Sequence, residues 1–279
     1  MAKSSSLRDA LRIPPGVPVD LDTLDARATP LAPGGKKKTA AGMAADGERL
    51  AGLQEALYAA GDQRVLVVLQ GMDTSGKGGV IDHVIGLVNP QGVHIHSFKK
   101  PTPEELRHHF LWRVRRALPG PGMLGIFDRS HYEDVLVARV HALGPPEVIE
   151  KRYAEINRFE ARLADEGVAL VKCFLQVSYD EQRERLLARL ADPAKHWKFN
   201  PGDLAERARW ADYQEAYRIA LERCSTPEAP WYAVPADRKW YRNWAAGRLL
   251  LETVRDLDPK YPQPDLDVPT LTKALAPPN

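Results

Sequence analysis

The chain has 279 residues, of which 44% are hydrophobic and 27% are charged, and its formal net charge is +2. This composition is typical of a globular domain large enough to bury a substantial core, and the charge is low for a dedicated nucleic-acid-binding protein. With only Cys173 and Cys224, a disulfide framework and a cysteine zinc cluster are excluded. No apolar run is long enough to span a bilayer and no signal peptide is recognisable, so we expect a cytoplasmic protein.

The first part of the chain predicts an arm, a helix and a strand. Residues 1–45 are rich in Pro, Gly, Ala and Lys, so we expect an extended N-terminal arm without a core of its own. Residues 46–60 carry apolar side chains at helical spacing and are followed by Gly61, a typical helix end. The unbroken apolar run 65–69 then predicts a strand that is covered on both faces.

A glycine-rich phosphate-binding motif follows this strand. Residues 71–77 fit the pattern G-x-x-x-x-G-K, in which backbone N–H groups and Lys77 surround an oligophosphate. The next position is Gly78, whereas a Ser or Thr hydroxyl normally binds Mg²⁺ there. Asp73 places a carboxylate inside the loop, where it would repel a phosphate unless a cation or an acceptor group lay between them. We therefore expect Asp73 to hold Mg²⁺ or to orient an incoming phosphate.

The chain continues with further alternating elements. The patterns predict a helix at 78–88, a strand at 93–98, a helix at 102–118 and a strand at 123–127. The third of these elements begins with Thr102 and Glu105, which form a capping-box pattern. The strand at 123–127 leads directly into Asp128 and Arg129. An acid at the carboxyl end of a strand near a phosphate loop is where a Mg²⁺-binding aspartate is expected.

The second half of the chain completes an alternating pattern. It predicts helices at 132–142 and 147–166, a strand at 168–177, a helical lid at about 180–202, a helix at 203–223, a strand at 231–235 and a helix at 236–257. The basic lid segment fits a solvated helix face, and equally a lid that closes over an anion. The Pro-rich residues 259–279 predict an extended C-terminal tail. Together these elements predict an α/β fold, a P-loop-type parallel sheet of about five strands flanked by helices.

Four segments together resemble the type-2 polyphosphate kinases. They are GMDTSGKGG, FDRSHYEDVL, EQRERLLARLADPAKHWK and WYAVPADRKWYRNW, and the resemblance covers about residues 54–250. It implies that residues 46–258 form a P-loop phosphotransferase domain. Enzymes of this family transfer the terminal phosphate of inorganic polyphosphate to a nucleotide, or the reverse, with Mg²⁺.

The resemblance and the chemistry of a polyanion donor together indicate the site residues. The expected catalytic residues are Asp73, Lys77, Asp128 and Arg129, with Asp73 and Asp128 as the metal ligands. The expected phosphate and polyphosphate ligands are Gly71, Ser75, Gly76, Gly78, Lys99, Arg185, Arg189 and Lys198. Asn89 and Glu133 are expected on the nucleotide side. Phosphoryl transfer depends mainly on positioning and charge neutralisation, so this set needs no covalent nucleophile.

Two local sequences resemble the subgroup that accepts both nucleoside mono- and diphosphates. They are Ser130-His131-Tyr132-Glu133 and Asn89-Pro90-Gln91-Gly92, whereas Gly78 departs from the aspartate that many members of that subgroup carry. The resemblance implies AMP, ADP and ATP as nucleotides, with GMP and GDP as further candidates. It also implies a homo-oligomer, and no nucleic-acid or membrane partner is expected.

Two other functions remain open at this level. One is an ATP-dependent kinase of nucleotides or of another small molecule, although the missing hydroxyl after Lys77 disfavours ordinary Mg-ATP at this loop. The other is a non-catalytic polyanion-binding protein that uses the basic triplet 36–38 and the arginine-rich lid. The low net charge and the absence of a basic stripe with interleaved aromatic residues disfavour this second function.

Overall fold

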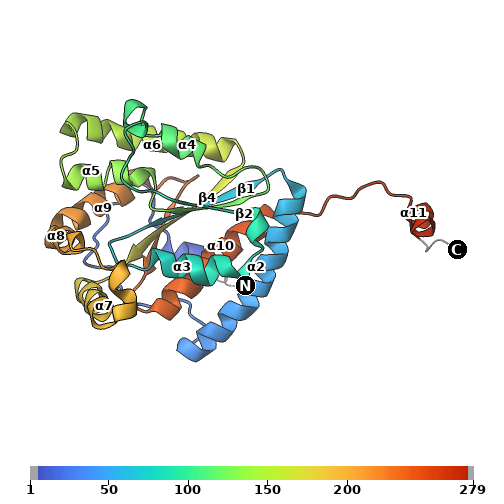
Figure 1. The fold of residues 1–279 in the computed structure, drawn as a ribbon, viewed down its shortest axis with the longest axis horizontal. Helices are drawn as coiled ribbons and strands as arrows, with labels where there is room; N and C mark the ends of the chain where they lie inside the picture. Colours follow the sequence, from blue (N-terminus) through green and yellow to red (C-terminus); the bar gives the residue numbers. More distant parts are fainter. Residues whose placement is uncertain (1–5, 276–279) are drawn as a thin grey trace.

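Five parallel strands form the centre of the computed structural model, which describes residues 6–275 (Figure 1). They are β1 Arg64–Gln70, β2 Val93–Ser97, β3 Leu124–Asp128, β4 Val168–Gln176 and β5 Trp231–Pro235. The strands lie in the order β2-β3-β1-β4-β5, and every neighbouring pair is parallel. All carboxyl ends therefore meet at one edge of the sheet. The predicted α/β fold with five parallel strands is confirmed.

Helices cover both faces of this sheet. One face is covered by α1 Leu7–Leu11, α2 Lys36–Ala60, α3 Lys77–Val84 and α10 Lys239–Leu257. The other is covered by α4 Trp112–Arg116, α5 Val137–Val140, α6 Pro146–Asp165 and α9 Trp210–Cys224. Successive residues of β1 alternate between the two hydrophobic cores, with Val67 in the first and Val68 in the second. This double covering explains why the strand has an unbroken apolar sequence.

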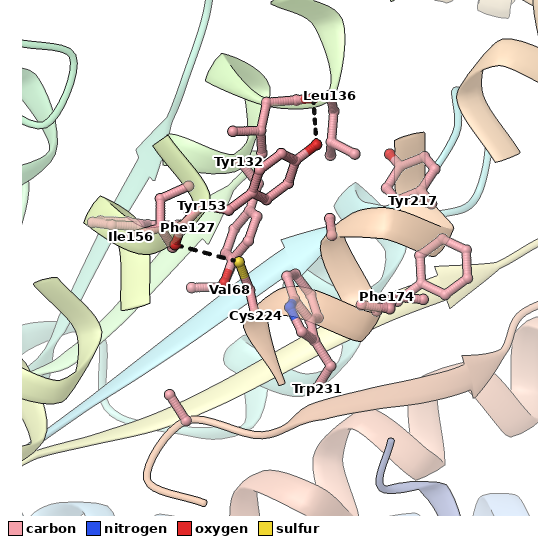
Figure 2. Packing of buried hydrophobic residues seen from close by; sticks show 14 of the residues in the cluster. Val68, Phe127, Tyr132, Leu136, Tyr153, Ile156, Phe174, Tyr217, Cys224 and Trp231 are labelled. Carbon is pink, nitrogen blue, oxygen red and sulfur yellow. Dashed lines mark hydrogen bonds between the residues drawn. The ribbon is translucent and has the colours of Figure 1, made fainter. Parts of the chain in front are cut away.

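The second core contains a group of large aromatic side chains. Figure 2 shows Tyr132, Tyr153 and Trp231 within this cluster. The rings of Tyr132 and Trp231 meet edge to face with centroids 4.7 Å apart, a favourable geometry for aromatic pairs. Tyr132, which follows β3, therefore packs against a rigid group of aromatic side chains.

The N-terminal segment differs from the prediction. The helix expected at 46–60 begins at Lys36, because Gly42 and Gly47 weaken the helical signal of its first half without preventing the helix. A side chain larger than glycine at position 47 would press on Leu87. The segment before it contains α1, whose Leu7 and Leu11 are buried in the core of the domain. The arm is therefore only partly extended and contributes to the main core.

Four predicted helices are shorter or interrupted. The helix expected at 78–88 is α3 followed by the 3₁₀ helix η1 Ile85–Leu87. The helix expected at 102–118 is a single 3₁₀ turn, η3 Glu105–Arg107, followed by α4, because His108 adopts an extended backbone. The helix expected at 132–142 is η4 His131–Asp134 followed by α5. The helix expected at 203–223 is divided at Arg209 into α8 Gly202–Ala208 and α9. The capping box of Thr102 and Glu105 does form, so a local start signal is not enough to extend a helix.

The lid and the tail also have defined structure. The lid consists of α7 Tyr179–Ala191 and the 3₁₀ helix η5 Pro193–Lys198, which begins at the proline. The tail is extended at first and then forms α11 Val268–Ala274, which lies away from the domain in Figure 1. The prediction of a fully extended tail is thus wrong at α11.

The packing of α1 leads to a test of stability. Leu11→Ala should lower the free energy of unfolding by about 2–5 kcal/mol, because it removes a buried side chain from the core. Val17→Ala is the matched control in the same segment, since Val17 is 47% exposed, and it should change the value by less than about 0.5 kcal/mol. Urea denaturation at fixed protein concentration measures both, and equal effects would contradict the packing of α1.

Candidate active site

The phosphate-binding loop joins β1 to α3 at the carboxyl edge of the sheet. It contains left-handed backbone conformations at Thr74, with φ +65°, and at Gly76, with φ +104°. A side chain at Gly76 would also overlap the guanidinium of Arg242, and a Cβ at Gly71 would lie 2.6 Å from the carbonyl oxygen of Leu175. The glycines are therefore required by backbone conformation and by close packing.

Lys77 lies inside this loop. Its Nζ donates hydrogen bonds to the carbonyl oxygens of Gly71 at 2.8 Å and Met72 at 3.4 Å. Burial, together with the nearby Arg129, lowers the pKa of Lys77, whereas the surrounding carboxylates oppose this shift. The loop thus contains a largely desolvated cation whose present acceptors are carbonyl oxygens that a phosphate oxygen can replace.

An acid and an arginine from β3 lie beside the loop. Leu69 of β1 pairs with Asp128, so the end of β3 is adjacent to the start of the loop. Arg129 follows and donates a hydrogen bond of 2.9 Å from Nη2 to Oδ1 of Asp73. Although burial alone would lower the pKa of Arg129, Glu133, Asp73 and Asp128 raise it. Arg129 is therefore a permanent cation that links the loop to the neighbouring strand end.

Glu133 lies on the other side of this arginine. Its Oε2 is 3.9 Å from Nε of Arg129, and its Oε1 accepts a hydrogen bond of 3.1 Å from Nε2 of Gln70. Burial raises the pKa of Glu133, and the Arg129 cation opposes that shift. The two acids Asp73 and Glu133 thus flank one guanidinium.

The two predicted metal ligands fit a magnesium ion that is completed by substrate. Oδ1 of Asp128 is buried without a hydrogen-bond partner, and its Oδ2 accepts only a long hydrogen bond of 3.4 Å from Ser97. Within residues 6–275 no group of three or more His, Cys, Asp or Glu is arranged to hold a metal ion. Mg²⁺ commonly uses one or two carboxylates and completes its octahedron with phosphate oxygens and water. Asp73 and Asp128 supply that kind of donor set.

A cavity of about 790 Å³ opens beside these residues, a volume within the range of ligand sites. Asp73, Arg129 and Glu133 line it together with Lys99, which the structure brings to the site as predicted. Its apolar wall consists of Phe98, Leu106, Leu136, Val137, Ala138 and Leu143. The cavity therefore has a charged part next to the loop and an apolar part beyond it.

A small polar cluster also lines this cavity. Nε2 of His141 lies 2.9 Å from Oε2 of Glu206, and Tyr213 donates a hydrogen bond of 2.5 Å from its hydroxyl to the same carboxylate oxygen. The sequence analysis did not identify this cluster. His141 lies 65 residues before Glu206 and joins the other two members through tertiary packing, which includes the contact of α5 with α9.

Arg185 has a different environment from the one predicted. It was expected to bind polyphosphate, but it is 8% exposed and donates to four carbonyl oxygens. These belong to Thr74, Ser75, Ala236 and Asp237, at distances of 2.6–3.1 Å. Its guanidinium thus supports the phosphate-binding loop from outside.

Two further predicted ligands of polyphosphate lie in the lid, whereas Asn89 lies elsewhere. Arg189 remains near the lid surface, where it donates to the carbonyl oxygen of Lys198 at 3.1 Å and lies 3.5 Å from Asp203. Lys198 is exposed beside Trp197. Asn89 is not brought to the site, because it caps the 3₁₀ turn that precedes β2 and so lies at the amino edge of the sheet. The structure therefore does not place Asn89 at the cavity where the nucleotide is expected.

Arg242 of α10 is a site residue that the sequence analysis missed. It is 4% exposed, and its Nη1 donates a hydrogen bond of 3.2 Å to the carbonyl oxygen of Ser75, which Arg185 also contacts. Burial, together with the neighbouring Arg185, lowers the pKa of Arg242 to about 10. The segment that contains it matches the family motif around β5, but nothing in the sequence shows that this arginine points at the loop.

Comparison with known proteins identifies the family. The sequence model of the family described as Polyphosphate kinase 2 (PPK2) matches residues 35–262. The chain belongs to this family. An AMP/ADP-polyphosphate phosphotransferase of Meiothermus ruber is 49% identical over 254 residues, which cover 91% of this chain and 95% of that protein. An ADP-polyphosphate phosphotransferase of Rhodopseudomonas palustris is 44% identical and covers 77% of this chain and 79% of its own length.

A solved structure of the family has the same fold. The crystal structure of polyphosphate kinase 2 from Arthrobacter aurescens TC1 superimposes with a TM-score of 0.94 at 47% sequence identity. The superposition covers 98% of this chain and 97% of the other. The family and the phosphotransferase class predicted from the sequence are therefore confirmed, whereas the roles of individual residues stay predictions.

The close packing of the loop can be tested by adding one methyl group. Gly76→Ala should destabilise the protein by at least about 1 kcal/mol, because it requires a left-handed alanine and displaces Arg242. Gly78→Ala is the matched control for stability, since its Cβ would have no atom within 4 Å. Thermal denaturation compares the two variants, and a loss of the same size in both would contradict the described packing.

Proposed function

We propose that this protein transfers the terminal phosphate of inorganic polyphosphate to a nucleoside mono- or diphosphate, and that it catalyses the reverse reaction. The observation that carries the proposal is the Asp73–Arg129 contact, which joins a phosphate-binding loop to a cavity of nucleotide size. The polyphosphate donor binds at the loop and the nucleotide in the cavity. The names of the relatives from Meiothermus ruber and Rhodopseudomonas palustris support this assignment.

The reaction is a direct transfer between the two bound substrates. An oxygen of the acceptor's terminal phosphate forms a bond to the terminal phosphorus of the donor, and the bond from that phosphorus to its bridging oxygen breaks. Lys77 and the loop N–H groups neutralise the donor, and Arg129 neutralises the transferred group where both substrates meet. Preorganised cations of this kind lower the barrier without a covalent intermediate on the protein.

Magnesium is proposed as the metal. Asp73 and Asp128 would hold it, and the buried, unpartnered oxygen of Asp128 supports this assignment. The ion would supply positive charge that offsets the negative charge of the phosphates. Asp73 also accepts the hydrogen bond from Arg129, which fixes its carboxylate at the border between the two substrates.

The cavity supports a dual acceptor. Its charged part contains Lys99, Arg129 and Glu133, which can position one or two phosphates, and its apolar part suits a nucleobase. We assign AMP and ADP as acceptors and ATP as the product of the second transfer. The polar cluster of His141, Glu206 and Tyr213 can contact the edge of a base, so GMP and GDP are also proposed acceptors.

The protein is also proposed to be a cytoplasmic homo-oligomer. The support for assembly is the segment around α11, which lies away from the domain with Leu266, Val268, Leu271 and Leu275 exposed. None of the helices described here is long and apolar enough to cross a membrane. Light scattering of the full chain and of residues 1–258 tests the assembly, because loss of an interface at α11 would lower the measured mass per particle.

The central experiment supplies polyphosphate as the only phosphate donor. Purified protein with Mg²⁺ and AMP should form ADP first and then ATP, which chromatography of the nucleotides resolves over time. Lys77→Ala and Asp128→Asn should each lower kcat by on the order of 10²-fold or more, because the first removes a cation that neutralises the donor and the second removes a carboxylate that would hold the metal ion. Transfer from ATP but not from polyphosphate to a small acceptor would contradict the proposal, and near-normal turnover by either variant would contradict the site assignment.

The lid cations give a separate test of the donor. Replacing both Arg189 and Lys198 by glutamine should raise the KM for polyphosphate. It should also weaken the dependence of this KM on salt concentration, because fewer cations bind the polyanion. The KM for the nucleotide should change little. The control neutralises Lys151 and Arg158, which are exposed on α6, and should leave both constants unchanged. An unaltered KM for polyphosphate in the lid variant would show that these two cations belong to a solvated surface and do not bind the donor.

A further inference from the structure

A fully buried polar cluster lies behind the end of β3. His131 and Tyr132 of η4, Glu160 of α6 and Lys172 of β4 all have 0% exposure. Burying an ion pair costs free energy that hydrogen bonds must offset, and an apolar replacement is often as stable. A contribution to stability alone is therefore a weak explanation for this cluster.

The hydrogen bonds within the cluster are complete at its centre. Nζ of Lys172 donates to Oε2 of Glu160 at 2.5 Å, to the hydroxyl of Tyr132 at 2.8 Å and to the carbonyl oxygen of Cys224 at 2.6 Å. The Tyr132 hydroxyl donates to Oε1 of Glu160 at 2.9 Å, and Nε2 of His131 lies 3.1 Å from the same oxygen. The ion pair thus fixes both residues at the start of η4.

A chain of hydrogen bonds connects this cluster to the active site. The N–H of Tyr132 and Nε2 of Gln70 each donate to Oγ of Ser130 at 3.1 Å. Gln70 also donates to Glu133, which lies beside Arg129. The residues that flank Arg129 on its C-terminal side are thereby held in place from the protein interior.

Arg129 needs such support because its backbone is strained. Its φ of +61° lies in the left-handed region, which non-glycine residues adopt at a cost unless the surroundings hold them there. Its own N–H donates to the carbonyl oxygen of Leu69 at 3.1 Å. In this conformation its guanidinium reaches Asp73 in the phosphate-binding loop.

We propose that Glu160 and Lys172 are positioning residues that act through Tyr132 and His131 on Arg129. They hold η4 so that Arg129 keeps its left-handed conformation and its guanidinium stays aimed at the transferred phosphate. This inference rests on the proposed function, because it assigns a catalytic role to Arg129. Neither Glu160 nor Lys172 contacts the cavity itself.

The test starts from Tyr132→Phe, which removes the shared hydroxyl and keeps the ring against Trp231. It should lower kcat by about tenfold and change both KM values by less than about twofold, because the misplaced guanidinium matters mainly in the transition state. The matched control is Tyr153→Phe, which removes another buried hydroxyl from the same core (Figure 2). That hydroxyl donates only a long hydrogen bond of 3.5 Å to Val135, so its loss should leave kcat unchanged.

A double-mutant cycle separates positioning from plain structure. In an Arg129→Ala background, Tyr132→Phe should have no further effect on kcat, because there is no guanidinium left to position. An equal fold-loss in both backgrounds, or no loss from Tyr132→Phe alone, would overturn the inference while leaving the proposed function in place. Near-normal kcat in Arg129→Ala would instead contradict the role given to Arg129 in the reaction.

A second variant tests the ion pair itself. Glu160→Gln combined with Lys172→Met removes both charges and leaves no uncompensated ion in the core, so the thermal midpoint should stay near that of the parent. The same kcat loss as in Tyr132→Phe is expected, again without further loss in the Arg129→Ala background. A stable double variant with full activity would overturn the assignment of these two residues.

Discussion

The shape of the phosphate-binding loop depends on cations that hold its carbonyl groups from outside. Arg185 of the lid and Arg242 of α10 both donate to the carbonyl oxygen of Ser75, and Arg185 also donates to that of Thr74. These contacts stabilise the left-handed turns of the loop. Donors fixed before the substrate arrives need no reorganisation during the reaction.

The same arrangement explains how the loop tolerates a carboxylate. Asp73 would repel a phosphate if it stood alone, but Arg129 neutralises it, while Lys77 and the two supporting arginines add positive charge around the loop. Even with its lowered pKa of about 10, Arg242 stays charged at neutral pH. The carboxylate of Asp73 thus lies among cations that come from several different elements. Deeper in the core, the buried Glu160–Lys172 pair binds the hydroxyl of Tyr132, which lies three residues after Arg129.

The sequence was sufficient for the features that depend on local pattern and topology. Local sequence patterns predicted all five strands, and parallel strands end at one edge. Asp73, Asp128 and Arg129 could therefore be brought together without coordinates. The same topology places Asn89, which precedes β2, at the opposite edge of the sheet. Topology is therefore the stricter guide for residues near strand ends.

Other features depend on side-chain direction and tertiary packing, which no local pattern contains. Arg185 was predicted to be a lid cation that binds polyphosphate, but its side chain points from α7 toward the phosphate-binding loop. No sequence pattern marks Lys172 and Glu160, because burial of a charged side chain becomes visible only when its partner is placed. The burial of Leu7 and Leu11 depends on contacts with α10 and β5, far away in the sequence.

Direct transfer requires that donor and acceptor occupy one site at the same time, on the two sides of the Asp73–Arg129 contact. Initial-rate kinetics with polyphosphate and ADP varied together test this requirement directly. Direct transfer predicts double-reciprocal lines that intersect, because both substrates must bind before product forms. Parallel lines would show that the phosphate passes first to the protein, and would contradict the central claim.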